Sequence, residues 1–513
     1  MSARHRNLFF AFALTFALTL ALGLELFNLA YTQNGDPDEG VYLSVARLLN
    51  HGYPYALIFL DQFSLFPHIL ALSLRVGGDS LLTGRLTIVL FSAFGLSGLA
   101  FLAQLLFRSK SGYAWIAAPL AILFAGANHY YLLPSRYTVL DVPSLALMLW
   151  ALVTGVRYAF GAARTWLVIS AMFFSASLLI KPLLIAMGLA LGGWLIVRHI
   201  VHSNGRWVIH WQDLALDGVI FGAVGVLTML PFLNSLNLPE EFQRTVGFHL
   251  QQAEVLAAGL NERQNGMISF LAENRGWLGL ALVGAAIAVY KYPRHVIPLL
   301  IAYFVSALLL LRLPPFPHHY AILVPLLALF AALTVQEGIG TLRRRWRDVL
   351  KFLQQPFSNI NPRTSAFQAF TFLIASAAAA GIWLHDAPQL ARYDYAVLTE
   401  RFDNRNPVIR FIQRTTNPDD FIISDDPKLV YLSGRLIPPS AVLLSYDSTF
   451  EFFDRSVEQV SASARDYSVK AFIVTGAYND KRQLMDWIAT HYPIMRTAGG
   501  GPQTIFARIY FRE

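Results

Sequence analysis

The sequence predicts a polytopic α-helical membrane protein with about eleven transmembrane helices and a small C-terminal α/β domain. Of its 513 residues, 55% are hydrophobic and only 14% are charged, whereas soluble domains carry about 25% charged residues. Apolar runs of about 20 residues, the length that crosses a bilayer as a helix, recur along the chain. After about Pro388 the pattern changes to short apolar or alternating runs between polar loops, which is typical of an α/β domain.

The net charge of +8 does not indicate a nucleic-acid partner, because the basic residues fall in short loops between apolar runs. The chain has no cysteine. Disulfides, thiol nucleophiles, iron–sulfur clusters and thiolate zinc sites are therefore excluded.

The first apolar run, residues 8–30, follows Arg4-His5-Arg6 and resembles a signal peptide. It is longer than about 20 residues and lacks a clean small-residue cleavage site, so we expect a retained helix. Glu25 lies near its end and is expected to face protein or water rather than lipid.

The remaining predicted spans follow at intervals along the chain. They are residues 80–107, 113–131, 138–157, 165–180, 182–198, 214–233, 276–290, 295–312, 319–336 and 366–385. The run 63–76 is short and interrupted by proline, and it predicts an interfacial or re-entrant helix.

Alternate loops between these spans carry most of the basic residues, and such loops stay in the cytoplasm. They hold Arg4 and Arg6; Arg108 and Lys110; Arg157 and Arg164; Arg198 and Arg206; Lys291 and Arg294; and Arg343-Arg344-Arg345-Trp346-Arg347 with Lys351. An odd number of spans then places the first loop, residues 31–79, and the C-terminal segment outside. We therefore expect a plasma (inner) membrane protein with an extracytoplasmic site.

These patterns divide the chain into a membrane part and an outer domain. The predicted parts are 1–335 in the membrane, 336–365 as a basic cytoplasmic linker forming a surface-lying helix, 366–386 as the last span and 387–513 as the extracytoplasmic α/β domain. Within that domain the predicted elements are buried strands at 420–426 and 469–476, an amphipathic helix at 481–491 and a closing strand at 504–511.

Three carboxylates follow the first span directly, at Asp36, Asp38 and Glu39. One interpretation is a solvated loop leading into a helix, where acidic residues complement the helix dipole. The other is a catalytic base in an extracytoplasmic cavity. Asp36 precedes Pro37 and is better explained as a turn residue.

Three basic residues lie on the expected outer side, against the trend of the loops. Arg136 precedes the 138–157 span, Lys181 separates the next two spans, and Arg312 precedes the 319–336 span. Each alone is explained by snorkelling to lipid headgroups or by pairing with a nearby acid. Together they form a set of cations on the carboxylates' side of the membrane, as an anionic lipid phosphate would require.

Other catalytic signatures are missing from the sequence. It has no phosphate-binding glycine loop, no HExxH motif and no nucleophile elbow for a serine triad. His318 and His319 are adjacent and would point apart on a helix, which makes a weak metal signal. Carboxylate chemistry with cationic support remains.

A series of short motifs occurs in one order on the expected outer side. They are Asp38-Glu39 with Tyr42; His51-Gly52-Tyr53-Pro54-Tyr55; Gly77-Gly78-Asp79-Ser80 with Thr83-Gly84-Arg85-Leu86; Arg136 with Asp141 and Pro143; Leu179-Ile180-Lys181-Pro182; and Pro317-His318-His319-Tyr320 with Pro325. This order resembles the GT-C glycosyltransferases of the protein O-mannosyltransferase and aminoarabinose-transferase type. The resemblance covers residues 1 to about 335, and the C-terminal domain is similar in placement only.

The resemblance implies an inverting glycosyltransferase. It would move a monosaccharide from a polyprenyl-phosphate donor to an extracytoplasmic hydroxyl or amine in one displacement. By position Asp38 would be the general base, with a pKa raised by shielding from water and by Glu39 beside it. Lys181, Arg136 and Arg312 would stabilise the departing phosphate.

The same resemblance marks further residues for the substrate. Asp141 would orient Arg136 or bind sugar hydroxyls, or it caps a helix ahead of a proline. Tyr42 and Tyr320 would pack on the sugar or phosphate, or they belong to the core. His319 belongs to the His-Tyr motif at the start of a late span.

Two positions depart from the family pattern. Val41 stands where aminoarabinose transferases have Arg, and Gln62-Phe63-Ser64 stands where much of the family has Lys-Pro-Pro. A transporter or flippase and a non-catalytic lipid-binding protein stay open as alternatives. A flippase predicts inverted repeats with broken helices in matching positions, and the sequence has no such symmetry.

No obligatory metal is expected. Asp36, Asp38 and Glu39 are nearly contiguous and cannot all converge on one ion from an extended backbone. A divalent metal stays an option, because the resemblance extends to oligosaccharyltransferases, which use one. The expected partners are the lipid-linked donor, membrane lipids and an acceptor glycan, lipid or protein.

Overall fold

The computed structural model covers most of the membrane part and of the C-terminal segment. The described residues are 3–30, 37–60, 62–107, 116–203, 206–233, 239, 242–247, 260–311, 316–352, 406–442, 457–476, 482–499 and 506–512. Three predictions lie outside the described residues: those for Asp36, for Arg312 and for the last span, 366–385.

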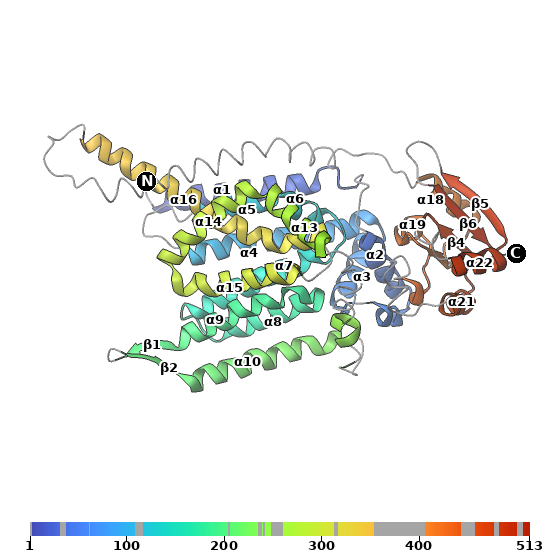
Figure 1. The fold of residues 1–513 in the computed structure, drawn as a ribbon, viewed down its shortest axis with the longest axis horizontal. Helices are drawn as coiled ribbons and strands as arrows, with labels where there is room; N and C mark the ends of the chain where they lie inside the picture. Colours follow the sequence, from blue (N-terminus) through green and yellow to red (C-terminus); the bar gives the residue numbers. More distant parts are fainter. Residues whose placement is uncertain are drawn as a thin grey trace.

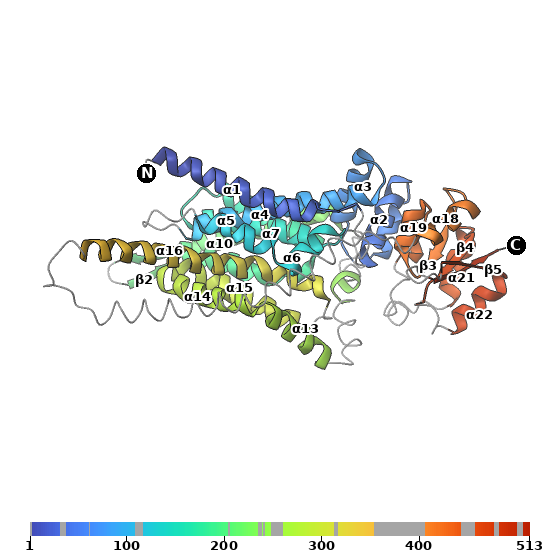
Figure 2. The same cartoon turned by 90° about the horizontal axis from the view of Figure 1, so that it is seen from above.

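The long helices run side by side along the long axis of the molecule (Figure 1, Figure 2). The C-terminal sheet lies at one end, and α2 (Pro37–Asn50) and α3 (Leu65–Gly77) lie between the sheet and the bundle. The long helices are α1 (Ala3–Leu26), α4 (Leu81–Leu106), α7 (Asp141–Ala159), α8 (Thr165–Ile180), α9 (Gly188–His199), α10 (Trp211–Met229), α14 (Arg275–Lys291), α15 (Pro293–Leu310) and α16 (Val324–Phe352).

The remaining elements of the membrane part join these helices. They are η1 (Pro54–Phe59), α5 (Ala117–Gly126), α6 (His129–Leu132), η2 (Pro134–Arg136), η3 (Pro182–Met187), the hairpin strands β1 (Ile200–Ser203) and β2 (Arg206–Ile209), η4 (Leu230–Phe232), η5 (Gln243–Gly247), α13 (Leu260–Glu273) and η7 (Pro317–Leu323).

Within the described ranges, seven helical segments are long and apolar enough to cross a membrane. They are Leu8–Leu26, Leu81–Leu106, Asp141–Ala159, Pro182–His199, Trp211–Phe232, Pro293–Leu310 and Pro317–Gly340. Shorter apolar helices are Leu65–Gly77, Ala117–Gly126 and Thr165–Ile180. The chain is therefore a polytopic helical membrane protein, as predicted.

The predicted 113–131 span is two helices, α5 and α6. Asn128 separates them, because its side chain caps α6 by accepting a hydrogen bond from the Tyr130 backbone N–H at 3.1 Å. The predicted 182–198 span likewise begins as the tighter turn η3 before α9.

Helix α16 continues into the segment predicted as a separate surface-lying helix. It runs unbroken from Val324 to Phe352. It passes through Gly338 and Gly340, which follow the predicted end of the span, and residues 341–352 contain neither glycine nor proline to end it. The first part of the basic linker is therefore an extension of a membrane helix, which corrects the prediction.

Helix α1 shows how the bundle divides its surfaces between lipid and protein. Phe12 and Phe16 are 68% and 57% exposed, as large apolar side chains in contact with lipid tails would be. Ala17 and Ala21 are buried on its inner face. A Cβ on Gly126 would lie only 2.6 Å from the Ala21 Cβ, so small residues let α1 and α5 approach closely.

The C-terminal segment forms a four-stranded sheet. Its order is β3 (Ile422–Ser424), β4 (Ala471–Val474), β6 (Phe506–Phe511) and β5 (Ile494–Gly499), with β3 parallel to β4 and the other pairs antiparallel. The accompanying helices are α18 (Asn406–Thr415), α19 (Pro427–Ser433), η8 (Pro439–Ala441), α21 (Val457–Asp466) and α22 (Arg482–His491).

The sheet has one strand that sequence reasoning missed. The predicted strands at 420–426, 469–476 and 504–511 contain β3, β4 and β6, and the first two are wholly buried. The edge strand β5 is almost entirely exposed. It therefore lacks the apolar alternation that marks a strand.

Candidate functional site

The first turn of α2 carries the two carboxylates that the sequence singles out. Pro37 stands at the first helical position, where its fixed φ suits the helix and its missing N–H costs nothing. Asp38 and Glu39 follow in the first turn, where acidic side chains complement the helix dipole. Asp38 is half-buried and Glu39 is fully buried. These adjacent carboxylates therefore have different surroundings.

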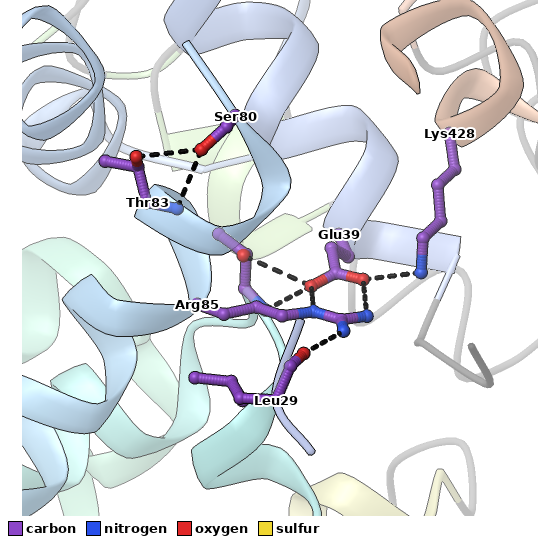
Figure 3. Close-up of polar contacts among 7 residues, drawn as sticks. Leu29, Glu39, Ser80, Thr83, Arg85 and Lys428 are labelled. Atoms are coloured by element: carbon purple, nitrogen blue, oxygen red, sulfur yellow. Dashed lines mark hydrogen bonds and ion pairs between the residues drawn. The ribbon is translucent and has the colours of Figure 1, made fainter. Parts of the chain in front are cut away.

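Glu39 is the centre of a buried ion-pair network (Figure 3). Arg85 donates from Nε to Oε1 at 2.8 Å and from Nη2 to Oε2 at 2.9 Å, while its Nη1 donates to the Leu29 carbonyl at 2.8 Å. Lys428 Nζ donates to Oε2 at 2.6 Å. Thr138 donates to Oε1 from its backbone N–H at 3.1 Å and its hydroxyl at 3.3 Å. Segments from four parts of the chain thus meet at one carboxylate.

The start of α4 positions Arg85. Ser80 caps this helix, because its Oγ accepts a hydrogen bond from the Thr83 N–H at 3.2 Å. Gly84 lets α4 come close to α2, since a Cβ there would lie 2.6 Å from Leu43 Cδ2. Helix α4 therefore packs in van der Waals contact with α2, and the Arg85 guanidinium reaches Glu39 from it.

The charges around Glu39 decide its ionisation. Burial alone would raise the pKa of Glu39, but Arg85 and Lys428 outweigh burial and hold that pKa far below its ordinary value. Glu39 is therefore ionised, and two cations balance its charge. Its engaged oxygens make it a residue that holds α2 in place, and the raised pKa of Asp38 stays a prediction.

Arg136 closes the end of the first span. Its Nη1 donates to the carbonyls of Leu24, Glu25 and Phe27 at 2.8, 3.0 and 2.8 Å, which would otherwise be unsatisfied at a helix C-terminus. Burial lowers the pKa of Arg136 to about 10, so the side chain stays charged at neutral pH. These contacts give Arg136 a structural role and do not add to the prediction that it binds phosphate.

Lys181 and Asp141 form a second ion pair. Lys181 Nζ lies 2.6 Å from Asp141 Oδ1, and the two side chains are 12% and 1% exposed. Lys181 ends α8 immediately before Pro182, which cannot continue the helix, and Asp141 begins α7. Asp141 therefore orients Lys181, where the sequence suggested Arg136.

The two ion pairs lie at the same end of the bundle. Thr138, which bonds to Glu39, precedes Asp141 by three residues. The Cα atoms of Thr138 and Asp141 are therefore at most about 11 Å apart. The shared position of Asp38 and Lys181 in one substrate site stays a prediction.

The predicted aromatic residues lie in packed clusters. Tyr42 meets Phe66 edge-on with ring centroids 5.8 Å apart. Tyr320 is 3% exposed and stacks on Phe270 at 5.1 Å. His319, half-buried, precedes it in η7. Of the two interpretations left open by the sequence, these contacts favour the core for both tyrosines.

Sequence reasoning missed Arg85 and Lys428 as site residues. Arg85 had a usable signal, because a charged residue inside the predicted 80–107 span needs a buried partner. Lys428 had none. It is 389 positions from Glu39, and no local pattern specifies a pair at that separation.

The described side chains around Asp38 do not fit a divalent metal. No group of three or more His, Asp or Glu residues that could hold one occurs in the described ranges. Each oxygen of Glu39 already accepts at least two hydrogen bonds, from Arg85, Lys428 and Thr138. Glu39 is therefore unsuited to share an ion with Asp38.

Solved structures with this arrangement cover nearly the whole chain. ArnT from Cupriavidus metallidurans bound to undecaprenyl phosphate matches with a TM-score of 0.60 at 14% identity, over 96% of this chain and 97% of that chain. The apo oligosaccharyltransferase from Archaeoglobus fulgidus matches with 0.57 at 12% identity, over 90% and 69%. AglB from the same organism, in complex with an inhibitory peptide and a dolichol-phosphate, matches with 0.52 at 13% identity, over 98% and 74%.

These matches establish the fold. The aminoarabinose transferase ArnT and the oligosaccharyltransferase AglB are both GT-C glycosyltransferases, and this chain has the GT-C fold. The resemblance seen in the sequence motifs is thereby confirmed at the level of fold. One structure of the Archaeoglobus oligosaccharyltransferase is a complex with Zn and sulfate, with a TM-score of 0.50 at 14% identity. No protein-family profile and no curated protein matches the sequence.

Proposed function

We propose that this chain is an inverting glycosyltransferase. It moves a monosaccharide from a polyprenyl-phosphate donor to an extracytoplasmic hydroxyl or amine of a glycan, lipid or protein. Two GT-C structures of the same fold hold undecaprenyl phosphate and a dolichol-phosphate, which supports a lipid-linked donor. The apolar helices suit a bilayer, and a polyprenyl-phosphate donor dissolves in a bilayer.

The observation that carries this proposal is the contrast between Asp38 and Glu39. Glu39 is completely enclosed and neutralised by Arg85 and Lys428. Asp38, one position earlier in the same helical turn, is half-buried. A general base needs both a fixed position and access to substrate, and Asp38 combines the two.

The reaction is a single displacement at the anomeric carbon. The acceptor oxygen or nitrogen forms a bond to C1 while the bond from C1 to the phosphate oxygen breaks. Asp38 takes the acceptor proton, and the polyprenyl phosphate leaves with the bonding electron pair. Because attack and departure occur on opposite faces, the anomeric configuration inverts.

Lys181 is proposed to stabilise the leaving phosphate. The phosphate gains negative charge as the C1–O bond breaks, and a preplaced cation lowers the energy of that state. The buried carboxylate of Asp141 fixes the Lys181 ammonium at 2.6 Å. The side chain still retains some exposure to a ligand. Asp38 and Lys181 supply the base and the cation without an obligatory metal in this proposal.

The site is proposed to face the outside of the plasma (inner) membrane. Helix α7 begins at Asp141, near the site, and its 19 residues end at Ala159, about 27 Å away. Arg157 and Arg164 lie at that far end. Basic loops stay in the cytoplasm, so the opposite end, with Asp38, belongs outside.

The lipid that co-purifies with the protein tests this function. Mass spectrometry of an organic extract of the purified protein should give a polyprenyl phosphate, alone or carrying a sugar. When that sugar donor is added back with an extract of envelope glycans and lipids, NMR of the product should show the opposite anomer. Product with a retained configuration would contradict the single displacement, and a purified protein that binds no polyprenyl phosphate would contradict the donor class.

A further inference from the structure

Helix α2 belongs to two hydrophobic cores at once. Its residues Val41, Val45 and Leu48 recur at helical spacing and are buried in the core of the C-terminal sheet and its helices. On other faces of the same helix, Leu43 and Ala46 are buried in the core of the membrane bundle. This explains the departure at Val41, since a charged side chain there would lie inside the C-terminal core.

Helix α19 also packs in both directions. Its Leu429 and Val430 lie in the C-terminal core, while Tyr431 lies in the membrane core. The face of α19 that packs against α2 is therefore continuous with both hydrophobic cores. A domain attached only by a linker would bury its own core and leave α2 to the bundle.

A second polar contact fixes the other end of α2. Arg47 Nε lies 2.6 Å from Asp79 Oδ2, and its Nη1 donates to the carbonyls of Tyr431 and Arg435 at 2.8 and 3.2 Å. The Tyr431 hydroxyl donates to Asp79 Oδ1 at 2.8 Å. The contact of Lys428 with Glu39 holds the first turn of α2, and the contacts of Arg47 hold its last turn.

Gly40 sets the distance between the two helices. A Cβ added there would lie against the backbone N of Lys428 and 2.7 Å from its Cα. These are backbone atoms, which cannot move aside as a flexible side-chain tip can. Only glycine allows α2 and α19 to meet this closely. Because the helices are so close, the Lys428 ammonium can contact the Glu39 carboxylate.

We propose that α19 is a built-in part of the catalytic site and that Lys428 is a positioning residue for Asp38. This inference rests on the proposed function and deepens it, since it assigns to the C-terminal domain a role in catalysis itself. Lys428 completes the charge balance of Glu39, and Glu39 fixes the first turn of α2. Asp38, in that turn, is thereby aimed at the acceptor.

Lys428→Met tests the inference in the full-length protein. We expect kcat for transfer to fall about 10–100-fold, by analogy with the loss found when a residue that supports a metal ligand is removed. The KM for the lipid donor should change less than about twofold, because the ammonium is engaged by Glu39. Lys470→Met is the matched control, since Lys470 is an exposed lysine of the same domain, and it should leave both constants unchanged. A rise in donor KM with unchanged kcat would overturn the positioning role.

A double substitution separates positioning from general destabilisation. If Lys428 acts through Glu39, Lys428→Met should cost no further kcat in a Glu39→Gln background, since coupled residues are not additive. Full additivity of the two losses would overturn the inference.

Hydrogen exchange of the same proteins gives a readout that does not require transfer. Lys428→Met and Gly40→Ala should each increase amide exchange in both α2 and α19, and Gly218→Ala, where a Cβ meets open space, should not. Unchanged exchange in α2 would refute the docking whatever the chain catalyses. Increased exchange in a protein that transfers no sugar would leave the docking in place and refute the proposed function.

Discussion

Glu39 is a carboxylate that the chain buries completely and surrounds with donors. Removing a charge from water costs several kcal/mol, and the cost is recovered only when the geometry of its partners is very good. Here a bidentate Arg85 and a short contact to Lys428 provide that geometry. Removing either cation should therefore destabilise the fold strongly, because the remaining charges stay buried and unbalanced.

This burial predicts a pH dependence of stability. The pKa of Glu39 is lowered in the folded protein, so its contribution is fully present above the unfolded value of about 4.3 and is lost as pH falls below it. Thermal unfolding of the wild type in detergent should therefore be insensitive to this group between about pH 5 and 7 and weaken at lower pH. Glu39→Gln should destabilise the protein at pH 7 by about 3–5 kcal/mol.

A matched variant isolates the effect of Glu39. Asp486→Asn removes an exposed carboxylate on α22 and should leave the pH profile unchanged. The two unfolding curves of wild type and Glu39→Gln should converge as pH falls. A constant difference between them down to pH 3 would show that Glu39 is not held ionised by its cations.

At the level of residues, the sequence predicted the types of group and none of the ion pairs that they form. Asp38, Glu39 and Lys181 stood out because a charged side chain at membrane depth is costly and usually has a functional role or a partner. The Asp141–Lys181 pair joins the starts and ends of neighbouring predicted spans, so topology made it foreseeable. Lys428 could not be foreseen, because its partner is fixed by domain docking.

At the level of elements, apolar length is a reliable guide to membrane helices and a poor guide to their ends. Each predicted span from 8–30 to 319–336 contains a helix in the structure. The errors arise where a local polar signal changes the backbone, as at the Asn128 cap between α5 and α6, or where a helix continues through glycines that usually end one, as α16 does at Gly338 and Gly340.

The sequence pattern alone could not predict which surfaces surround helix α2. A helix after the acidic residues was one of two interpretations of the sequence, with no surface assigned to cover it. In the structure it is buried on several sides, between the bundle and α19. Its periodic apolar residues predict burial, and the identity of the covering surfaces comes from the fold.

At the scale of the whole molecule, the account depends on which end of the bundle faces out. The chain has no cysteine, so single cysteines can report orientation without background. In intact cells, a membrane-impermeant maleimide should label Lys470→Cys in the C-terminal domain. It should label Ala163→Cys, in the exposed turn between α7 and α8, only after permeabilisation. Labelling in the reverse pattern would contradict the extracytoplasmic site.

The two cores joined through α2 make the molecule one catalytic unit in this account, with Asp38 at the junction. The most direct test is the rate of a single turnover by Asp38→Asn with the bound polyprenyl-phosphate sugar at saturation. Loss of a general base should lower that rate about 10²–10⁴-fold while donor binding and the unfolding temperature stay as in the wild type. Transfer at the wild-type rate would contradict the central claim.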